Sequence, residues 1–405
     1  MNFKLALVAA AALGVASTAQ AADLAKKAPA AANYVKVCDA QGAGFFYIPG
    51  SDTCLKIGGY VRAESRFGGY DGNIGGPNGI GGHRSERGFY SRVRANINFD
   101  ARTATEYGLL RSYIELWATQ NSGDTSPGMN LRQAFVQFAG ITAGRAQSFW
   151  DFVEGSYTIG NIEADSSDRR VNQLAYTFSF GNGITATAAL EDYSTDDATS
   201  SLRPSSTYAG GVKYPDLLGV LAISQAWGKA QLMGALHSNY GLTKDKLGFA
   251  VGAGVEVNLP MLAPGDKVFV QGTYTKGALG YAMLNNPNPF LLPTDTARTA
   301  LATDFGFEAN DVKQSTAWGI NWGLHHEFTK TWEANLGGSY LKYEDWRSAN
   351  TRDFSQWIVG GDVRWKPVSN LYFGLALDYI SVDYKSSALK DASQVLGTLR
   401  VQRNF

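Results

Sequence analysis

The chain has 405 residues with equal numbers of basic and acidic side chains, 36 of each, so no net field would attract it to nucleic acid. Beyond residues 5–16, no apolar run approaches the roughly 18 residues that a membrane-spanning helix needs. Two classes of protein are then still possible, a soluble exported protein and a transmembrane β-barrel. The 46 glycines and 21 phenylalanines favour the barrel, whose strands have one lipid-facing side and one water-facing side.

The N-terminus has the pattern of a secretory signal peptide. Lys4 supplies the positive charge, residues 5–14 the apolar stretch, and Ala19-Gln20-Ala21 a small-x-small cleavage site. We expect residues 1–21 to be removed, so that the mature chain starts at Ala22. Residues 22–55 are then a periplasmic segment and residues 56–405 a transmembrane barrel in the outer membrane of a Gram-negative cell.

Cys38 and Cys54 are the only two cysteines in the chain. In an exported protein, an even pair at this spacing favours a disulfide over a metal site or a reactive thiol. We therefore expect the two residues to be bonded.

From Lys56 onward the chain alternates between apolar and polar residues with the two-residue period of a β-strand. Residues 89–100 are the clearest case, with Val93 and Ile97 on one face and Arg92, Arg94 and Asn96 on the other. The same alternation recurs at residues 247–258 and 356–366 and continues to the last residue, Phe405. The polar faces are too polar for a packed core, which indicates a water-filled interior.

The connections between these strands alternate between short and long, as bacterial outer-membrane barrels require. Short turns are expected at residues 101–105, 139–140, 181–183, 228–229, 259–266, 329–330 and 366–370. Long loops are expected at residues 68–88, 120–130, 149–170, 192–219, 239–246, 278–312, 345–353 and 385–391. The sequence thus predicts an all-β fold, a sixteen-stranded antiparallel transmembrane β-barrel. Residues 207–214 could form a seventeenth strand, but an even number is required, so we place them in the fourth long loop.

Two charged groups are candidates for a pore constriction. One is a basic wall on the first three strands, and the other is a set of acids in the third long loop, which follows the fifth strand. The wall comprises Arg62, Arg66, Arg92, Arg94 and Arg111, and the loop contains Asp151, Glu154, Glu163, Asp165 and Asp168. If the loop folds inward, the acids would face the arginines across a narrow section and create a transverse field. The alternative is that these charges neutralise one another as salt bridges.

Other site chemistry has weak support in the sequence. His83, His237, His325 and His326 lack paired metal-ligand spacing, and the glycine-rich residues 68–82 lack a phosphate-binding pattern. A lipase-like triad could be assembled on paper from His237-Ser238 and His326 with Asn321, but no GxSxG elbow is present. We expect no enzyme activity, no cofactor and no metal.

Four segments resemble the porins of rhizobial alphaproteobacteria: residues 37–65, residues 131–152, the run SQAWGKAQLMGALH, and the terminal LRVQRNF. The resemblance spans the chain and implies a sixteen-stranded homotrimeric general porin that passes small hydrophilic solutes. It also implies an inward-folded third loop, with Asp151, Glu154, Glu163 and Asp165 opposite Arg62, Arg92, Arg94 and Arg111. Expected partners are outer-membrane lipid, lipopolysaccharide, and the barrel-insertion machinery, which would read Phe405.

The main alternative function is a substrate-selective porin, specific for sugars or anions, on the same barrel. Mixed acids and bases favour the general pore, because an arginine ladder without acids would favour anions. A soluble β-sandwich is disfavoured because it would bury the charges of Arg92, Arg94 and Asp100. A plugged transporter is disfavoured because too few residues precede the first strand.

Overall fold

The computed structural model describes residues 36–71, 88–153, 157–160, 164–195, 212–241, 243–283, 302–308, 311–347, 352–387, 389 and 391–405. Among these residues, no helix is both long enough and apolar enough to cross a membrane. The predicted signal peptide lies outside the described residues.

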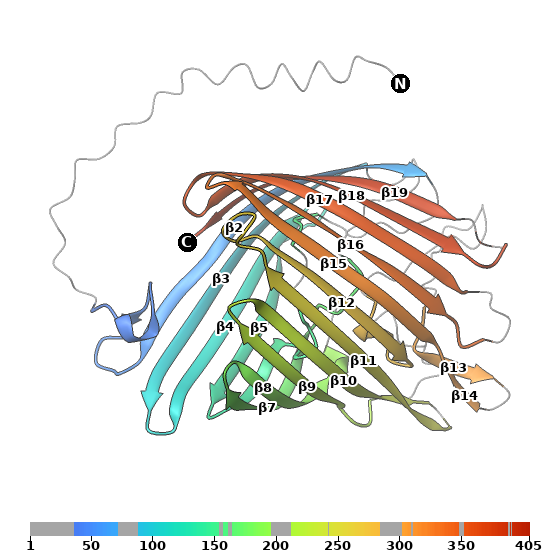
Figure 1. Cartoon of the computed structure of the whole chain (residues 1–405), viewed down its shortest axis with the longest axis horizontal. Coiled ribbons are helices and arrows are strands. Elements are labelled where there is room, and N and C mark those ends of the chain that lie inside the picture. The colour runs from blue at the N-terminus through green and yellow to red at the C-terminus, as the bar shows by residue number, and fades with distance from the viewer. Residues whose placement is uncertain are drawn as a thin grey trace, which may run out of the picture.

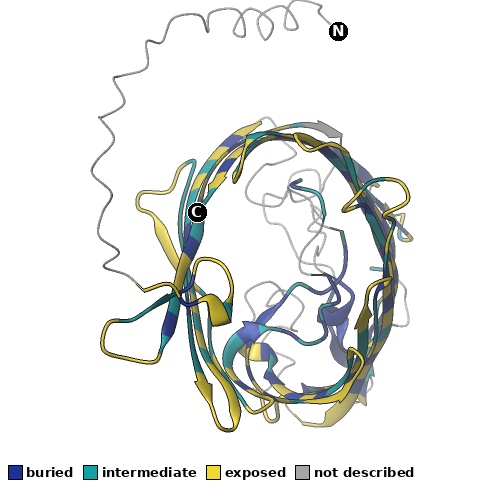
Figure 2. Ribbon diagram, turned by 60° about the vertical axis from the view of Figure 1, so that its left-hand side comes forward, coloured by how far each residue is buried: buried dark blue, intermediate teal, exposed yellow. Residues whose placement is uncertain are grey.

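Sixteen long antiparallel strands form a closed barrel, as predicted (Figures 1 and 2). In chain order they are β2 (Cys54–Asp71), β3 (Phe89–Thr105), β4 (Gly108–Asn121), β5 (Gly128–Phe138), β6 (Ile141–Gln147), β7 (Arg170–Gly181), β8 (Ile184–Asp192), β9 (Asp216–Gln225), β10 (Gly228–Tyr240), β11 (Asp245–Asn258), β12 (Lys267–Lys276), β15 (Thr316–Thr329), β16 (Trp332–Glu344), β17 (Phe354–Val368), β18 (Leu371–Tyr384) and β19 (Ala392–Asn404). A two-residue strand, β1 (Phe46–Tyr47), pairs with the start of β2.

The last strand closes the barrel against the first. β19 pairs with β2 from Ser393↔Asp71 to Asn404↔Tyr60. The terminal residue Phe405 continues this ladder, because its backbone N–H donates to the Gly59 carbonyl (3.0 Å) and its carbonyl accepts from the Gly59 N–H (3.2 Å). Closure leaves no free sheet edge, which is a condition for strands in hydrocarbon.

The two faces of the sheet differ as the sequence predicts. Outward side chains are apolar and exposed on the single chain, including Val61, Val93 and Ile97. Inward side chains on the same strands are polar and largely buried, including Glu64 and Asn96. The alternation therefore separates a lipid-facing surface from a polar lumen.

Aromatic residues lie on the outer face near both ends of the strands. At the end with the short turns, the Trp332 and Trp365 rings stack with centroids 6.2 Å apart. Toward the other end, the Tyr340 ring lies 4.6 Å from Trp357 and 5.3 Å from Trp318. These two bands have the positions of the aromatic girdles at the two membrane interfaces.

The turns agree with the prediction to within a few residues. Asn182 and Gly183 connect β7 and β8 with φ of 51° and 76°, the left-handed pair that a two-residue hairpin needs. The fourth long loop ends earlier than expected, because Leu217 and Gly219 already pair within β9. Residues 212–214 lie outside any strand, and residues 207–211 lie outside the described residues.

The long connection between β12 and β15 has structure of its own. It contains a 3-10 helix, η5 (Leu279–Tyr281), and a hairpin of β13 (Phe305–Glu308) and β14 (Asp311–Gln314). The sequence predicts only a loop at residues 278–312. In the described parts of this connection, Leu279, Tyr281 and Phe305 are buried, so apolar side chains fold these parts against the barrel.

Cys38 and Cys54 form a disulfide, as expected. Both are buried with Phe45 in a small cluster of their own, outside the main barrel contacts. The bond connects the segment before β1 to the first residue of β2.

Replacing Cys38 and Cys54 together with Ala should free this segment without opening the barrel. Closing a loop of this separation stabilises the cross-linked segment by roughly 3 kcal/mol in the chain-entropy model. Limited proteolysis should then cut within residues 36–53, while residues 54–405 stay resistant and heat-modifiable on a gel. Cleavage within β2–β19 at the same protease concentration would show that the bond supports the whole barrel.

Candidate pore lining

A cluster of arginines lies on the inner wall where β19, β2 and β3 meet. Register places Arg62 beside Arg94, and Glu64 between Arg92 on one side and Arg400 on the other. The fully buried Glu64 carboxylate accepts from Arg66 (2.8 Å) and from Arg400 Nε (2.6 Å), with Arg92 at 3.9 Å and Arg62 at 4.0 Å. One acid thus holds several arginines in place.

Aromatic rings and polar side chains fix the same arginines. The Arg94 guanidinium lies 3.8 Å from the Trp117 ring, and its Nε donates to Thr119 (2.9 Å). The Arg62 guanidinium lies 4.5 Å from the Tyr60 ring. Because arginine stays charged and stacks on aromatic faces, these contacts hold positive charge at defined places on the wall.

The structure brings four of the five predicted arginines together, but not Arg111. Arg111 is opposite Arg102, near the short turn between β3 and β4, and both bind Asp100 at 2.9 and 2.8 Å. Its Nη1 also donates to Gln137 (3.0 Å). Glu64 and Arg400 also belong to the cluster, although neither was predicted as a site residue. The sequence shows both residues on the polar faces of their strands, Glu64 in the first strand and Arg400 in the last. These two strands become neighbours only when the barrel closes.

The segment between β6 and β7, residues 148–169, contacts side chains on the inner wall of distant strands. Near its start, Lys229 donates to the Phe152 carbonyl (2.7 Å) and Gln231 to the Phe149 carbonyl (3.0 Å). Further along, the Tyr157 hydroxyl donates to Glu256. The strands contacted here are β10 and β11.

The middle of the segment reaches β16 and β17. The Ile159 backbone donates to Asp362 (2.7 Å) and the Asp165 backbone to Ser339 (2.8 Å). The Asp165 carboxylate accepts from Gln356 (2.5 Å). All three wall residues are buried on the lumen side. Figure 2 shows buried chain inside the ring of strands.

Apolar and charged contacts hold the base of this segment. Trp150 is fully buried against Tyr281 of η5, with ring centroids 4.6 Å apart. Phe152 packs over Gly254, where a Cβ would lie 2.5 Å from the Phe152 ring. Ser148 donates to the buried Glu191 (2.8 Å), and Arg169 stacks 3.8 Å over the Tyr281 ring. The β6–β7 segment is therefore anchored to the connection that follows β12.

The predicted loop acids lie in different surroundings. Asp151 is at the base of the segment, where its carboxylate accepts from Gln147 and from the Arg169 backbone (2.8 Å). Burial and the neighbouring Asp168 raise the pKa of Asp151 to about 7. Although burial opposes ionisation of Asp168, ion pairs with Arg170 (2.5 Å) and Arg132 (3.8 Å) keep its pKa below the usual value. Glu154 and Glu163 lie outside the described residues.

The histidines have local hydrogen-bond partners. His237 contacts Asp216 at 2.7 Å and His326 contacts Asp266 at 2.6 Å, while His83 lies outside the described residues. Among the described residues, ligand atoms of His325, Glu327 and Glu333 converge within 4.8 Å, a spacing that could hold a metal ion. Lys366 already donates to Glu333 (2.6 Å) and Glu327 (3.5 Å), so a cation is present there without a metal.

The closed barrel, its apolar outer face, its girdles and its charged lumen define an outer-membrane channel fold. The sequence model of the porin subfamily matches residues 23–400. The chain therefore belongs to the porin subfamily of the outer membrane, as the resemblance implied.

Comparison with individual proteins supports the assignment to the porin family. The chain is 35% identical over 250 residues to porin Omp2b of Brucella canis, an alignment that covers 56% of this chain and 64% of the relative's length. The outer-membrane channel DcaP of Acinetobacter baumannii has a similar structure, with a TM-score of 0.71, 14% identity, and coverage of 89% of this chain and 99% of that one. OmpF of Salmonella typhi gives a TM-score of 0.57 at 12% identity, covering 88% and 99%. At these identities the two structures support the fold alone.

The titration of Asp151 predicts how the anchoring of the β6–β7 segment depends on pH. Its pKa is raised from 3.8 to about 7, so the folded segment binds a proton that the opened segment releases. Its contribution to stability is therefore fully present near pH 4 and is lost as the pH rises to about 7. Hydrogen exchange of amides 148–153 and 164–169, corrected for intrinsic rates, should become on the order of a hundredfold faster over that range.

The matched variant is Asp151→Asn, whose side-chain oxygen still accepts from Gln147 and the Arg169 backbone. Its exchange should be slow at both pH values, with amides in β16 as an internal reference. Equal pH dependence in the variant and the wild type would assign the effect to another group.

Proposed function

We propose that the chain forms a passive, water-filled channel through which small hydrophilic solutes and ions diffuse. The observation that carries the proposal is the approach of the β6–β7 segment to the inner wall at β10, β11, β16 and β17, because chain inside the barrel narrows the path. Family membership supports a channel and not an enzyme.

The arginine cluster is the basic side of the constriction in this proposal. Arg62, Arg66, Arg92 and Arg400 lie within 4.0 Å of the buried carboxylate of Glu64, and Arg94 lies opposite Arg62 on the neighbouring strand. Of the predicted acids, Asp165 is held by Gln356, and Asp151 is at the base of the segment. The transverse field then comes mainly from the basic wall, with Asp165, Glu154 and Glu163 as the opposing acids.

This charge imbalance favours a second candidate function, an anion-preferring porin on the same barrel. Five arginines against one carboxylate leave positive charge at the wall even though the whole chain is neutral. A local positive potential raises the concentration of anions in a narrow passage. Single-channel recording with reversal potentials in a salt gradient separates the two candidates.

The variant Arg92→Gln with Arg94→Gln should shift the reversal potential toward cations and change the single-channel conductance. The physical reason is the removal of two fixed positive charges from the proposed constriction. Arg111→Gln is the control, because it removes a lumen arginine that is paired with Asp100 away from the cluster. If Arg111→Gln shifts the potential as much as the double variant, the constriction is not at the cluster.

We also propose that the channel is a homotrimer whose subunits meet over the outer face of β2–β6. Within these strands the described outward side chains include no Trp or Tyr, whereas Tyr274, Trp318, Tyr340, Trp357 and Trp365 are outward on β12–β17. Girdle aromatics mark surfaces in contact with lipid, so a face that lacks them fits protein contact. Small outward residues such as Ala95 and Ala118 allow close approach.

Ala95→Trp should therefore break the trimer into monomers, because the indole fills the proposed contact. Ala253→Trp is the matched control, since Ala253 is an exposed outward alanine on β11. The measurement is the mass of the detergent-solubilised protein by light scattering or native mass spectrometry. A trimer that survives Ala95→Trp and is lost with Ala253→Trp would place the contact on the opposite side.

A further inference from the structure

Four aromatic residues form a stripe on the lumen side of β2, β4 and β5, between the arginine cluster and the short turns. In the strand register, two of them lie on either side of Asn96 and a third lies opposite Asp100. Asn96 and Asp100 are buried lumen-side residues, and residues directly opposite one another share a face of the sheet, so these rings face the lumen. The aromatic stripe comprises Tyr60, Trp117, Tyr113 and Phe135.

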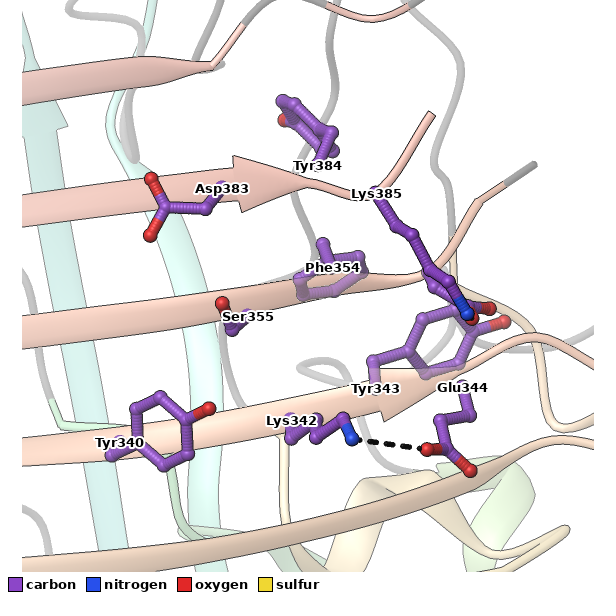
Figure 3. A pocket seen from close by; sticks show the side chains of 10 residues that line it. Tyr340, Lys342, Tyr343, Glu344, Phe354, Ser355, Asp383, Tyr384 and Lys385 are labelled. Atoms are coloured by element: carbon purple, nitrogen blue, oxygen red, sulfur yellow. Dashed lines mark hydrogen bonds and ion pairs between the residues drawn. The ribbon is translucent and has the colours of Figure 1, made fainter. Parts of the chain in front are cut away.

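The rings of the aromatic stripe are only half-buried, although they lie inside the barrel. On β16, β17 and β18 the inward rings of Tyr343, Phe354 and Tyr384 are instead buried and pack against one another, with centroids 5.0 and 6.2 Å apart (Figure 3). The start and the middle of the β6–β7 segment contact the wall on β10, β11, β16 and β17. The stripe is therefore an apolar surface that stays partly in contact with lumen water, and such surfaces are typical of binding sites.

Arginines lie against the end of the stripe that adjoins the cluster. The Arg62 guanidinium lies 4.5 Å from the Tyr60 ring. The guanidinium groups of Arg94 and Arg132 lie 3.8 and 4.2 Å from the Trp117 ring. Because guanidinium planes stack on aromatic faces, this end of the stripe is a surface that is both aromatic and positively charged.

The other end of the stripe offers ring surface with less charge. The Tyr113 and Phe135 rings stack with centroids 5.3 Å apart at an interplanar angle of 30°. The Arg111 guanidinium lies 5.0 and 5.4 Å from these two rings, but it is paired with Asp100 and donates to Gln137. A solute that moves from the cluster toward the short turns therefore passes from strongly charged rings to nearly neutral ones.

Two acids lie among the rings of the stripe, Glu115 and the arginine-paired Asp100. The Glu115 carboxylate accepts from Asn96 (2.7 Å) and from Trp117 Nε1 (3.1 Å). It also accepts from Gln133 (2.8 Å). The basic side chains on the lumen side of the same strands outnumber these acids, and they are Lys56, Arg62, Arg94, Arg102, Arg111 and Arg132. The surroundings of the stripe are therefore positive overall.

The spacing of rings and arginines matches a solute that carries both an aromatic ring and a carboxylate. Tyr60 and Arg62 are two residues apart on the same face of β2, which is about 7 Å along the strand at 3.3 Å per residue. Arg94 lies directly opposite Arg62. A planar solute can thus place its ring against Tyr60 while its carboxylate reaches one of these two guanidinium groups, which bind carboxylates through parallel N–H groups.

We propose that the aromatic stripe binds aromatic carboxylates, so that the channel favours them over other organic anions of the same charge. The proposal rests on the proposed channel and gives its anion preference a chemical class. The ring of the solute packs on the rings and guanidinium groups of the stripe, while its carboxylate binds the arginines at the end next to the cluster. An aliphatic acid makes the same ion pair without the stacking, so it is held less tightly.

An aromatic acid fits the stripe better than a sugar acid does. A sugar acid also has a carboxylate and an apolar ring face, but its hydroxyl groups need hydrogen-bond partners on the wall. The carboxamides of Asn96 and Gln133, which lie among the rings, already donate to Glu115. A preference for a hydroxyl-rich acid is therefore the competing outcome that the experiment has to detect.

The test measures the affinities of benzoate and cyclohexanecarboxylate from the open-channel current noise of the full-length protein in planar bilayers at neutral pH. The two anions have the same charge and similar size, and only benzoate has an aromatic ring. The wild type should bind benzoate about threefold more tightly, because stacking on an exposed ring or guanidinium is worth a factor of this size. Glucuronate, a sugar acid, should bind no more tightly than cyclohexanecarboxylate.

Tyr60→Leu should lower the ratio of the benzoate affinity to the cyclohexanecarboxylate affinity to near unity, and Tyr113→Leu with Phe135→Leu should lower it as well. Leucine keeps an apolar side chain but removes the ring, whereas Tyr60→Phe keeps the ring and should keep the ratio. A general disturbance of the wall would change both affinities together and leave their ratio unchanged. Phe249→Leu with Tyr274→Leu is the matched control, because these two rings also lie together, 6.0 Å apart, but on the outer face of β11 and β12. This control should have the ratio of the wild type.

Three results would overturn the proposal. They are equal affinities of the wild type for benzoate and cyclohexanecarboxylate, tighter binding of glucuronate than of benzoate, and a wild-type ratio in both sets of leucine variants of the stripe. The current in potassium chloride alone is recorded first on each sample. Absence of this current in the wild type would reject the proposed channel, whereas a normal current with equal affinities would reject only the binding site on the stripe.

Discussion

The pairing of every strand edge is the constraint on which the rest of the structure depends. In hydrocarbon an unpaired backbone N–H or carbonyl costs several kcal/mol, so a sheet is stable there only if it closes. The chain meets this condition to its last residue, since Phe405 exchanges both backbone hydrogen bonds with Gly59. Closure also joins residues from opposite ends of the sequence, and this brings Arg400 beside Glu64.

A closed barrel of this size leaves an interior that side chains on the wall do not fill. The described residues of the β6–β7 segment contact polar groups of the inner wall, such as the Asp362 and Ser339 side chains, as well as apolar residues near Trp150. The contacts of the segment differ along its length: apolar packing predominates at its base, and hydrogen bonds predominate at its middle. The base is held by buried apolar and charged contacts, while the middle is held by hydrogen bonds to polar wall residues.

Sequence periodicity was sufficient to predict the strands, their faces and their number, because a lipid-facing surface requires strict alternation over ten or more residues. The disulfide also followed from composition and compartment. The two exceptions have different causes. The start of β9 at Asp216 was missed because Leu217 and Leu218 break the apolar–polar pattern, although Leu218 faces the buried side and Leu217 the exposed side. Order in the β12–β15 connection was missed because it comes from long-range burial.

In the candidate site, too, contacts between consecutive strands could be predicted from the sequence, whereas contacts that depend on strand register could not. Arg62, Arg66, Arg92 and Arg94 are neighbours because β2 and β3 are consecutive, and sequence reasoning could group them. Arg111 was grouped with them by strand order alone, but position along the strand places it with Asp100 instead. Glu64 and Arg400 could not be assigned from the sequence, because their contact depends on the register of the first strand against the last.

The arrangement around Glu64 explains how a wet lumen can hold several like charges close together. Without a carboxylate, adjacent arginines would repel one another and turn toward water, and with equal numbers of acids their field would cancel. One buried carboxylate that accepts from Arg66 and Arg400 offsets part of the repulsion and sets the direction of both side chains. The Tyr60 and Trp117 rings fix Arg62 and Arg94 without adding negative charge. These contacts hold the cluster in place and leave it with more positive than negative charge, which the proposed constriction requires.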